Sequence, residues 1–439
     1  MMTEPVSKPT TLYEQSIRQA LPGPLSMVKE SAWVQNLRHQ ALSRFETLGL
    51  PTRKQETWRY VDLKPVLDLH FDHATAPETI FEQDIQPYLF SESNTSTLVF
   101  VNGHYQPTLS NVTGLPQNVI LSAFDSQIKS ILASDINTES DAFVALNTAL
   151  FQDAAVLWIP ENTVITQPVH VMFYHQSSQP MPQMAHSRLL VVVEKNAKLT
   201  LVTSLIDSKN QTVPLLANSV TEFVLHENAV LNATHFQVGC HAGRILASAK
   251  ASLDQNAQLK LNTFALGGDF SRQSLQVTLQ GEKAHAELNG LCVLTGHQQA
   301  YAHTIVDHAV PDCTTEQVYK GILSGESRSE FDGTIVIRPG AQQSDASQLN
   351  QNLLLSEEAR VITRPQLRID ADDVKCAHGA TVGQLSEEEL FYLRSRGLSA
   401  THARAILTFA FAQTVIDKVP IFSLRRELKD LVIRNLDKK

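Results

Sequence analysis

A short motif recurs along the middle of the chain, with an asparagine at a turn, an alanine directly after it and a leucine two positions further on. It appears in EKNAKLTLV, HENAVLNAT and DQNAQLKLN, and more weakly in EKAHAELNG. The alanines of these copies are Ala197, Ala229, Ala257 and Ala284, so the steps between them are 32, 28 and 27 residues. A repeat of about this length, made of short strands with no helices between them, is typical of the stacked rungs of a solenoid.

Each residue of the motif has a physical reason to be at the corner of such a rung. Asparagine tolerates the left-handed backbone that a tight corner requires, and the small alanine fits its inner side. We therefore predict a mainly β fold, with a right-handed parallel β-helix (β-solenoid) core over residues 155–383. Leucine-rich repeats have a different consensus, and a Greek-key sandwich would not explain the recurring motif. The copies after Gly290 are degenerate, so the sequence does not fix the register there.

The core is expected to be flanked by two α-helical regions, of which the first covers residues 1–154. Apolar residues at three- and four-residue spacing predict a helix over 25–48, and further helices are expected around 121–132 and 141–151, with a strand at 98–101. The segment 53–66 places Trp58 and Tyr60 among charged residues. We interpret it as an amphipathic segment that folds over a core, in preference to a ligand site.

The second helical region covers residues 384–439. Ser386 and Glu389 form a capping-box pattern, Gly397 is placed to end that helix, and a second helix is expected from Ser399. Pro420 separates it from a third amphipathic helix over about 424–436. Because an uncovered last rung would leave unpaired strand edges, we expect these helices to close the solenoid, docking on their own chain rather than on a partner.

Composition excludes several classes of function. The chain has 439 residues and a formal net charge of -9, which argues against a nucleic-acid surface. Its N-terminus lacks a signal-peptide pattern, and its apolar runs are too short to span a membrane. Four cysteines in so long a chain do not make a disulfide framework, so we expect a cytoplasmic protein. We found no P-loop, C-x-x-C, H-E-x-x-H or G-x-S-x-G motif.

One site candidate lies at the junction between the last expected strand and the C-terminal helices. Cys376 and His378 are two residues apart and share a strand face, giving a soft sulfur and nitrogen pair suited to iron, zinc or copper. The other cysteines are at least 63 residues away, so the chain alone is not expected to hold a full cluster. The pair would be a half-site that another protein completes.

Other interpretations of these residues remain open at this point. On the residues alone, a packed cysteine beside a hydrogen-bonded histidine is favoured over a metal role. A nucleophilic cysteine and histidine pair is less favoured, because no third group in the local sequence orients the base. The acidic residues Asp370, Asp372 and Asp373 resemble the catalytic groups of β-helix polysaccharide enzymes, but we interpret them as a solvated turn.

The C-terminal third resembles the SufB/SufD family of iron–sulfur cluster assembly scaffolds. The similarity is carried by residues 347–399, which include ITRPQLRIDADDVKCAHGATVG, by ETWRY at 56–60 and by IPENTVITQPVHV at the start of the expected solenoid. Within the family, the length and the K-C-x-H-G-A-T-V-G form are similar to the SufD branch. The SufB branch normally has glutamates around the corresponding histidine and a sulfur-accepting cysteine within the solenoid.

The resemblance implies a scaffold subunit without catalysis of its own. It implies pairing with a SufB-like scaffold through the solenoid ends and binding of a SufC-like ATPase through the C-terminal helices. The family histidine at the nascent cluster falls on His378, with Cys376 as its neighbour, and the ATPase contact falls on Phe391, Tyr392, Arg394 and Arg396. ATP-driven dimerisation of the ATPase would then move the two scaffolds apart.

The resemblance also bears on cofactors and on alternative functions. It implies no stably held cofactor, only transient iron or a cluster shared with the SufB-like partner; reduced flavin in the complex and a homodimer of the chain alone stay open. The first alternative is a purely structural subunit that organises the other two proteins without a metal ligand. The second, less favoured, is a β-helix carbohydrate-active enzyme.

Overall fold

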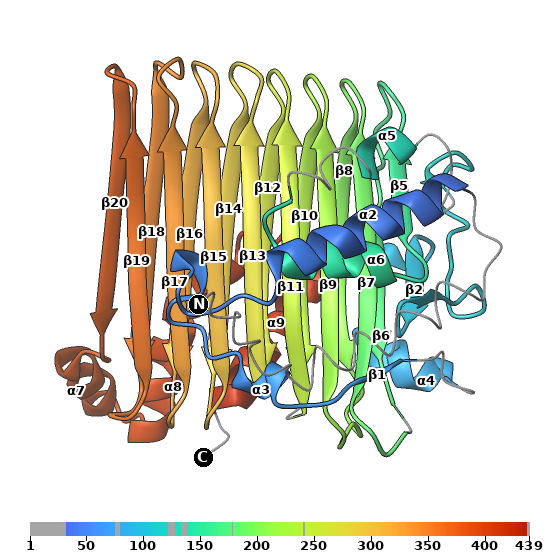
Figure 1. Cartoon of the computed structure of the whole chain (residues 1–439). Coiled ribbons are helices and arrows are strands. Elements are labelled where there is room, and N and C mark those ends of the chain that lie inside the picture. Colours follow the sequence, from blue (N-terminus) through green and yellow to red (C-terminus); the bar gives the residue numbers. More distant parts are fainter. Residues whose placement is uncertain are drawn as a thin grey trace, which may run out of the picture.

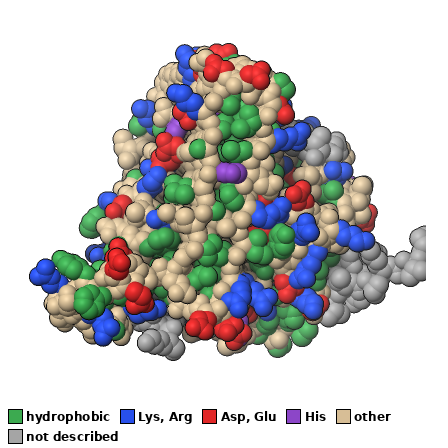
Figure 2. Space-filling model, turned by 90° about the vertical axis from the view of Figure 1, so that its left-hand side faces the viewer, with side chains coloured by type: hydrophobic (Ala, Val, Ile, Leu, Met, Phe, Trp, Pro, Cys, Tyr) green, Lys and Arg blue, Asp and Glu red, His purple; other side chains and the backbone are tan. Residues whose placement is uncertain are grey.

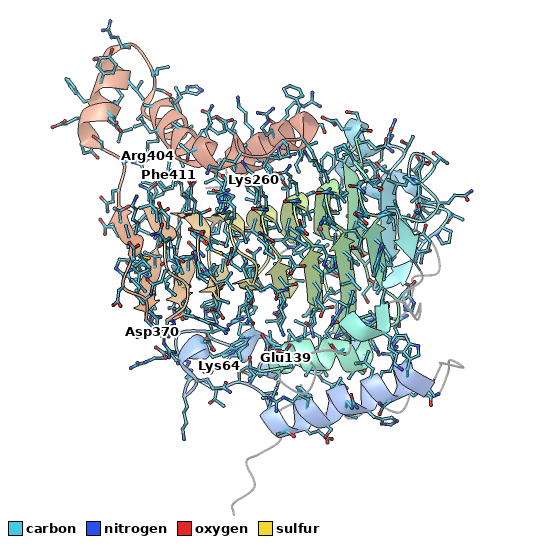
Figure 3. The ribbon with its side chains drawn as sticks, turned by 90° about the horizontal axis from the view of Figure 1, so that it is seen from above. Lys64, Glu139, Lys260, Asp370, Arg404 and Phe411 are labelled. Atoms are coloured by element: carbon cyan, nitrogen blue, oxygen red, sulfur yellow. The ribbon has the colours of Figure 1, made fainter. Side chains whose placement is uncertain are left out.

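The computed structural model describes residues 32–74, 80–121, 128–132, 139–177, 179–239 and 242–436. Two large sheets lie face to face, and successive long strands alternate between them (Figure 1). Helices cover the outer face of each sheet, so the molecule has four layers when seen from above (Figure 3). This arrangement confirms the predicted β-solenoid with flanking helices.

The first sheet has the strand order β19-β17-β15-β13-β11-β9-β7-β5-β4, and β1 pairs with β7. Its strands are β1 (Asp72–His73), β4 (Ile120–Leu121), β5 (Ala155–Ile159), β7 (Gln183–Val193), β9 (Leu215–Leu225), β11 (Gly243–Leu253), β13 (Phe270–Leu279), β15 (Gln299–His308), β17 (Arg328–Ile337) and β19 (Arg360–Ile369).

The second sheet has the order β20-β18-β16-β14-β12-β10-β8-β6-β2-β3. Its strands are β2 (Thr97–Val101), β3 (His104–Tyr105), β6 (Val169–His175), β8 (Lys198–Asp207), β10 (Val230–Gly239), β12 (Gln258–Gly267), β14 (His285–Leu294), β16 (Thr314–Leu323), β18 (Ser344–Leu354) and β20 (Val374–Gly383). The ladders from β6 to β20 are parallel and stay in register through the degenerate copies after Gly290.

The recurring asparagines form one corner of the solenoid. Asn196, Asn228 and Asn256 have φ values of 58°, 58° and 55°, which lie in the left-handed region. Their side-chain amides also bond along the stack, because Asn228 Nδ2 donates to Asn196 Oδ1 at 2.9 Å and Asn256 Nδ2 donates to Asn228 Oδ1 at 3.0 Å. The motif therefore supplies both the backbone angle and a ladder of hydrogen bonds.

The alanine and leucine of each copy lie in the core between the two sheets. The alanines Ala197, Ala229, Ala257 and Ala284 are fully buried there, together with the leucines that follow them. In the later copies the left-handed corner positions are taken by Lys283, Asp312 and Gln343. Because these residue types differ from asparagine, the sequence motif fades while the corner geometry continues.

The N-terminal elements cover the outer face of the first sheet. They include α2 (Ala32–Leu48), η1 (Glu56–Trp58), α3 (Lys64–Leu67), α5 (Lys129–Leu132) and α6 (Ala142–Leu150). Their apolar side chains form a second core with outward-facing residues of the sheet, such as Leu190, Leu216 and Phe270. The remaining short helices α4 (Glu82–Ile85), η2 (Gln86–Tyr88) and η3 (Ser91–Ser93) lie beside the early strands of the second sheet.

The helices expected over 25–48 and 141–151 are present within the described residues, although residues 25–31 lie outside them. The strand expected over 98–101 is also present, as β2. The helix expected around 121–132 is wrong at its start, because β4 pairs there with β5. Residues 122–127 lie outside the described part, and only the short α5 follows. The apolar run at 120–121 extends the first sheet, which the helical spacing did not reveal.

The C-terminal elements are α7 (Glu387–Ser395), α8 (Ala400–Ile416) and α9 (Phe422–Leu436). Ser386 caps α7 by accepting a hydrogen bond from the Glu389 amide at 3.3 Å, and Gly397 follows that helix with a φ of 92°, as predicted. The pair α8 and α9 packs on its own chain, against the outer face of the second sheet. Arg404 and Phe411 on α8 lie on the same side of the solenoid as Lys260 of β12 (Figure 3).

These helices do not close the last rung, so that expectation is wrong. The apolar outer face of the second sheet lies further back along the stack, where Phe236, Phe264 and Leu291 contact the core shared with α8 and α9. The hydrophobic effect therefore places the helix pair on the flank, because burial follows apolar area. The strands β19 and β20 are left at one end of the solenoid, beside the projecting α7 (Figure 1).

Candidate functional site at the open end of the solenoid

The two sheets end together at what we call the open end, formed by β19 and β20. Within the described residues, β19 pairs only with β17 and β20 pairs only with β18. Each strand therefore has one edge whose backbone N–H and C=O groups have no strand to pair with. Figure 2 shows this end of the molecule, with charged side chains mostly toward its borders.

The cysteine and histidine singled out in the sequence lie in β20, on the last rung. Cys376 packs against the core between the sheets, so its side chain faces inward. His378, two residues further along the strand, is on the same face. Cys376 is half-buried and His378 is exposed. The imidazole is therefore accessible from outside the molecule.

The surroundings of Cys376 favour a neutral thiol. Burial raises the pKa of this thiol above its usual range, and the neighbouring Asp345 carboxylate raises it further. A thiolate is the form that binds metals, so a bound cation would have to displace the proton. Among the described residues, no group of three or more His, Cys, Asp or Glu side chains is placed to hold a metal ion.

The other described cysteines are distant from this pair in the stack. Cys292 lies on β14 and donates to, or accepts from, Ser329 Oγ at 3.7 Å. Cys313 is fully buried directly after the corner residue Asp312. It occupies the corner place that alanine fills in earlier copies, which its spacing of 29 residues from Ala284 would have indicated. Cys240 lies outside the described residues.

The second group of predicted site residues is displayed on α7 and on Arg396, which directly follows it. The aromatic side chains of Phe391 and Tyr392 are 75% and 57% exposed, and Arg394 and Arg396 are exposed beside them. The Arg396 guanidinium lies 5.2 Å from the centroid of the Tyr392 ring. In Figure 1, α7 projects beyond the strands at the open end. The structure thus brings the predicted residues together in two neighbouring groups, one in β20 and one in α7.

The segment that contains ETWRY folds over the outer face of the first sheet, as interpreted from the sequence. Trp58 is buried against the guanidinium of Arg272, and Arg364 of β19 pairs with Glu56 at 3.0 Å. This contact links the N-terminal region to the last strand of the first sheet. Arg272 and Arg364 were not predicted from the sequence, because a charged residue within a strand does not indicate which residues it will contact.

The acidic residues after β19 form the exposed turn between β19 and β20, as interpreted. Asp373 accepts a hydrogen bond from Gln343 Nε2 at 2.7 Å, which joins this turn to the preceding corner. Asp370 is labelled in Figure 3, at the same end of the solenoid. Separately, no helix within the described residues is both long and apolar enough to cross a membrane.

Comparison with known proteins agrees with this architecture. Residues 173–411 match the family described as SUF system FeS cluster assembly, SufBD core domain, and residues 23–171 match the SufBD protein N-terminal region. An iron–sulfur cluster assembly SufBD family protein of Synechocystis is 35% identical over 430 residues, covering 93% of this chain and 94% of the relative.

Two further relatives carry the name SufD. The iron–sulfur cluster assembly protein SufD of Escherichia coli is 28% identical, covering 89% of this chain and 90% of the relative. That of Bacillus subtilis is 24% identical, covering 93% of this chain and 95% of the relative. Taken together, the two family matches extend over most of the solenoid and its flanking helices, as does the Synechocystis relative. The chain therefore belongs to the SufBD family of iron–sulfur cluster assembly proteins.

Proposed function

We propose that this chain is a SufD-type scaffold subunit that pairs with a SufB-type scaffold through its open end. The observation that carries the proposal is that β19 and β20 both present an unpaired edge at the same end of the solenoid. A sheet edge can be extended by a strand of another protein, whose backbone groups then satisfy the free N–H and C=O groups. When no SufB-type partner is present, two copies of this chain pair through the same edges.

His378 is the residue that we propose to contact iron or a nascent cluster, which is the cargo of the complex. Its imidazole is exposed at the open end, beside the half-buried Cys376. Iron–sulfur sites take thiolate and imidazole donors, usually four. This chain would offer one or two of them, and the SufB-type partner would supply the rest. The chain carries no catalysis of its own in this scheme, and the compartment is the cytoplasm.

The surface of α7 is the proposed contact for a SufC-type ATPase. Exposed aromatic rings beside arginines have the composition of interface hot spots, and Phe391, Tyr392, Arg394 and Arg396 form such a group. Since α7 projects next to the open end, movement of a bound ATPase would act on the scaffold interface. ATP-driven dimerisation of two ATPase subunits would then separate the scaffolds and open the site between them.

Co-expression with the SufB-type and SufC-type proteins of the same genome tests the pairing. We expect one complex with one copy of each scaffold and two ATPase subunits, measured by native mass spectrometry. The exposed pair Ala377→Lys and Thr381→Lys in β20 should abolish scaffold pairing, because lysines at a free edge oppose strand addition. The matched control is Ala410→Lys with Thr414→Lys on the exposed side of α8. Equal loss in both variants, or none in either, would refute pairing through the open end.

A second candidate is a purely structural role, in which the chain only holds the other two proteins in place. The raised pKa of the Cys376 thiol favours it, because a neutral thiol is a poor metal ligand. In that case, the complex should bind iron equally well when His378 is replaced by alanine.

A further inference from the structure

Polar side chains inside the solenoid form a hydrogen-bonded stack that leads toward the open end. Thr304 of β15 donates from Oγ1 to Gln317 Oε1 at 3.4 Å, and Gln348 of β18 donates from Nε2 to the same oxygen at 2.7 Å. All three residues are at most 2% exposed. Buried amide groups need hydrogen-bond partners, so these bonds constrain the orientation of each side chain.

The stack leaves one donor and one acceptor over. Gln317 Nε2 and Gln348 Oε1 are buried, and neither has a hydrogen-bond partner among the described residues. An unsatisfied buried carbonyl destabilises a fold by about 1–3 kcal/mol, so its retention calls for a reason. Gly333, opposite on β17, leaves room for this amide, because a Cβ there would lie 2.4 Å from Gln348 Nε2. The interior is therefore shaped to hold a glutamine at this position.

The next residue along the stack from Gln348 is His378. The two are partners in the parallel ladder between β18 and β20. Adjacent strands are about 4.8 Å apart, and both side chains are on the inward face of the second sheet. Gln348 Nε2 points back to the preceding rung, which leaves Oε1 for the rung of His378. The exposed imidazole can turn about its side-chain bonds on a fast timescale.

We propose that Gln348 is a positioning residue, whose Oε1 accepts a hydrogen bond from one ring N–H of His378. This bond fixes the imidazole tautomer and leaves the lone pair of the other ring nitrogen directed out of the open end. Metal-binding histidines almost always donate their second N–H to a carbonyl or carboxylate in this way. That this hydrogen bond serves metal binding rests on the proposed iron role of His378, whereas the hydrogen bond itself can be measured without metal.

One other group could accept the same proton. Thr363 of β19 faces the interior from the opposite sheet, and its Oγ1 is likewise buried without a partner among the described residues. Thr363→Val is therefore measured together with Gln348→Leu. A matched control is Gln351→Leu, because Gln351 is on β18 but faces outward.

The test is ¹⁵N NMR of the histidine side chains in the metal-free full chain at pH 8. His378→Ala identifies the signal. We expect one dominant tautomer in the wild type and in Gln351→Leu, and a shift toward the mixture of free imidazole in Gln348→Leu. Gln348→Glu retains an acceptor and should restore the single tautomer. An unchanged tautomer in Gln348→Leu, or a change in Thr363→Val alone, would overturn the proposal.

A second measurement separates this proposal from the iron role. Titration with Co²⁺, followed by its visible absorption, should show affinity reduced by about 10–100-fold in Gln348→Leu and unchanged in Gln351→Leu. If His378→Ala binds Co²⁺ as the wild type does while the tautomer still depends on Gln348, the iron role fails and the hydrogen bond stands. If His378→Ala abolishes Co²⁺ binding and the tautomer of His378 is the same in Gln348→Leu as in the wild type, the iron role stands and the positioning role fails.

Discussion

The guanidinium carbon of Arg272 lies 3.7 Å from the centroid of the Trp58 ring. Arg272 belongs to β13 and Trp58 to η1, so this stacking fastens the N-terminal segment to the outer face of the first sheet. The same guanidinium donates to the Thr57 carbonyl at 3.2 Å. Burial lowers the pKa of Arg272, while the nearby carboxylates Asp141, Glu330 and Asp332 raise it. The contact is therefore a buried cation held by an aromatic ring and by acidic neighbours.

Replacing Trp58 by alanine should lower the free energy of unfolding by about 3–5 kcal/mol, because it removes a large buried side chain and its cation–π partner. Tyr60, 40% exposed in the same segment, is the control, and its replacement by alanine should have a much smaller effect. Urea denaturation, followed by far-UV circular dichroism rather than by tryptophan fluorescence, measures the free energy of unfolding of both variants. Equal losses for the two variants would show that the stacking on Arg272 does not anchor the segment.

Glu330 should make stability fall as the pH rises toward neutrality. Burial raises the pKa of Glu330 to about 7, and Asp332 adds to the effect, against Arg364 and Arg272. The unfolded chain loses this proton near the ordinary value of 4.5, so between 4.5 and 7 the folded state holds a proton that the unfolded state has lost. The contribution of Glu330 to stability is therefore lost across that window.

Glu330→Gln, which cannot ionise, should be more stable than the wild type by about 2–3 kcal/mol at pH 8 and similar to it near pH 4.5. Free energies of unfolding at the two pH values test this expectation. A difference between variant and wild type that does not change with pH would contradict a titrating Glu330.

The ion pairs of Glu287 should give the opposite pH dependence. Its Oε1 lies 2.7 Å from Lys418 Nζ, just beyond α8, and its Oε2 lies 3.1 Å from Lys260 Nζ of β12. Burial alone would raise the pKa of Glu287, but hydrogen bonds from Lys418, Asn289 and Lys260 lower it to about 2. The resulting stability is present above pH 4.5 and is lost as the pH falls toward 2.

Glu287→Gln should therefore be less stable than the wild type at pH 7, by about 1–2 kcal/mol because the side chain is partly exposed. Asp417→Asn is the matched control and should have little effect, because Asp417 is exposed next to Lys418 and forms no ion pair with another described residue. Urea denaturation at pH 7 and pH 3 is the measurement. Persistence of the full difference at pH 3 would rule out the ionised carboxylate as its source.

The corner asparagines should be replaceable by glycine at a smaller loss than by alanine. Asn228 has a φ of 58° and bonds to the amides of Asn196 and Asn256. Asn228→Ala loses both the ladder bonds and the left-handed preference, and should destabilise the fold by about 2–3 kcal/mol. Asn228→Gly also loses the ladder bonds, but glycine adopts the left-handed backbone angle without strain. About half of the loss in stability is therefore expected for this variant. Equal effects would mean that the backbone angle contributes nothing.

The solenoid core was predictable because its signal is local and repeated. Asn196, Asn228 and Asn256 are spaced by the length of a rung, and a left-handed corner suits few residue types. The positions that continue the corners, Asp312 and Gln343, carry no such signal alone. Their place follows from hydrogen bonds to the neighbouring rungs, such as that from the Gln343 amide to the Asp373 carbonyl at 2.6 Å.

The open end was harder to predict, since the sequence shows that α8 is amphipathic but not which surface it covers. Its position depends on Phe236, Phe264 and Leu291, which are apart in the chain and meet only on the outer face of the folded sheet. Pairing of Cys376 with His378 on one face was predictable from strand alternation. Their exposure, and the place of Gln348 beside His378, depend on which rung is last.

Iron binding by the chain alone and by its complex with the SufB-type partner tests the central claim most directly. Anaerobic Fe²⁺ binding should be weak for the isolated chain and strong for the pair. In the pair, His378→Ala should bind iron at least tenfold more weakly while the subunit stoichiometry stays unchanged. Tight binding by the isolated chain, or equal binding by the wild-type and His378→Ala pairs, would contradict a site that the partner completes at the open end.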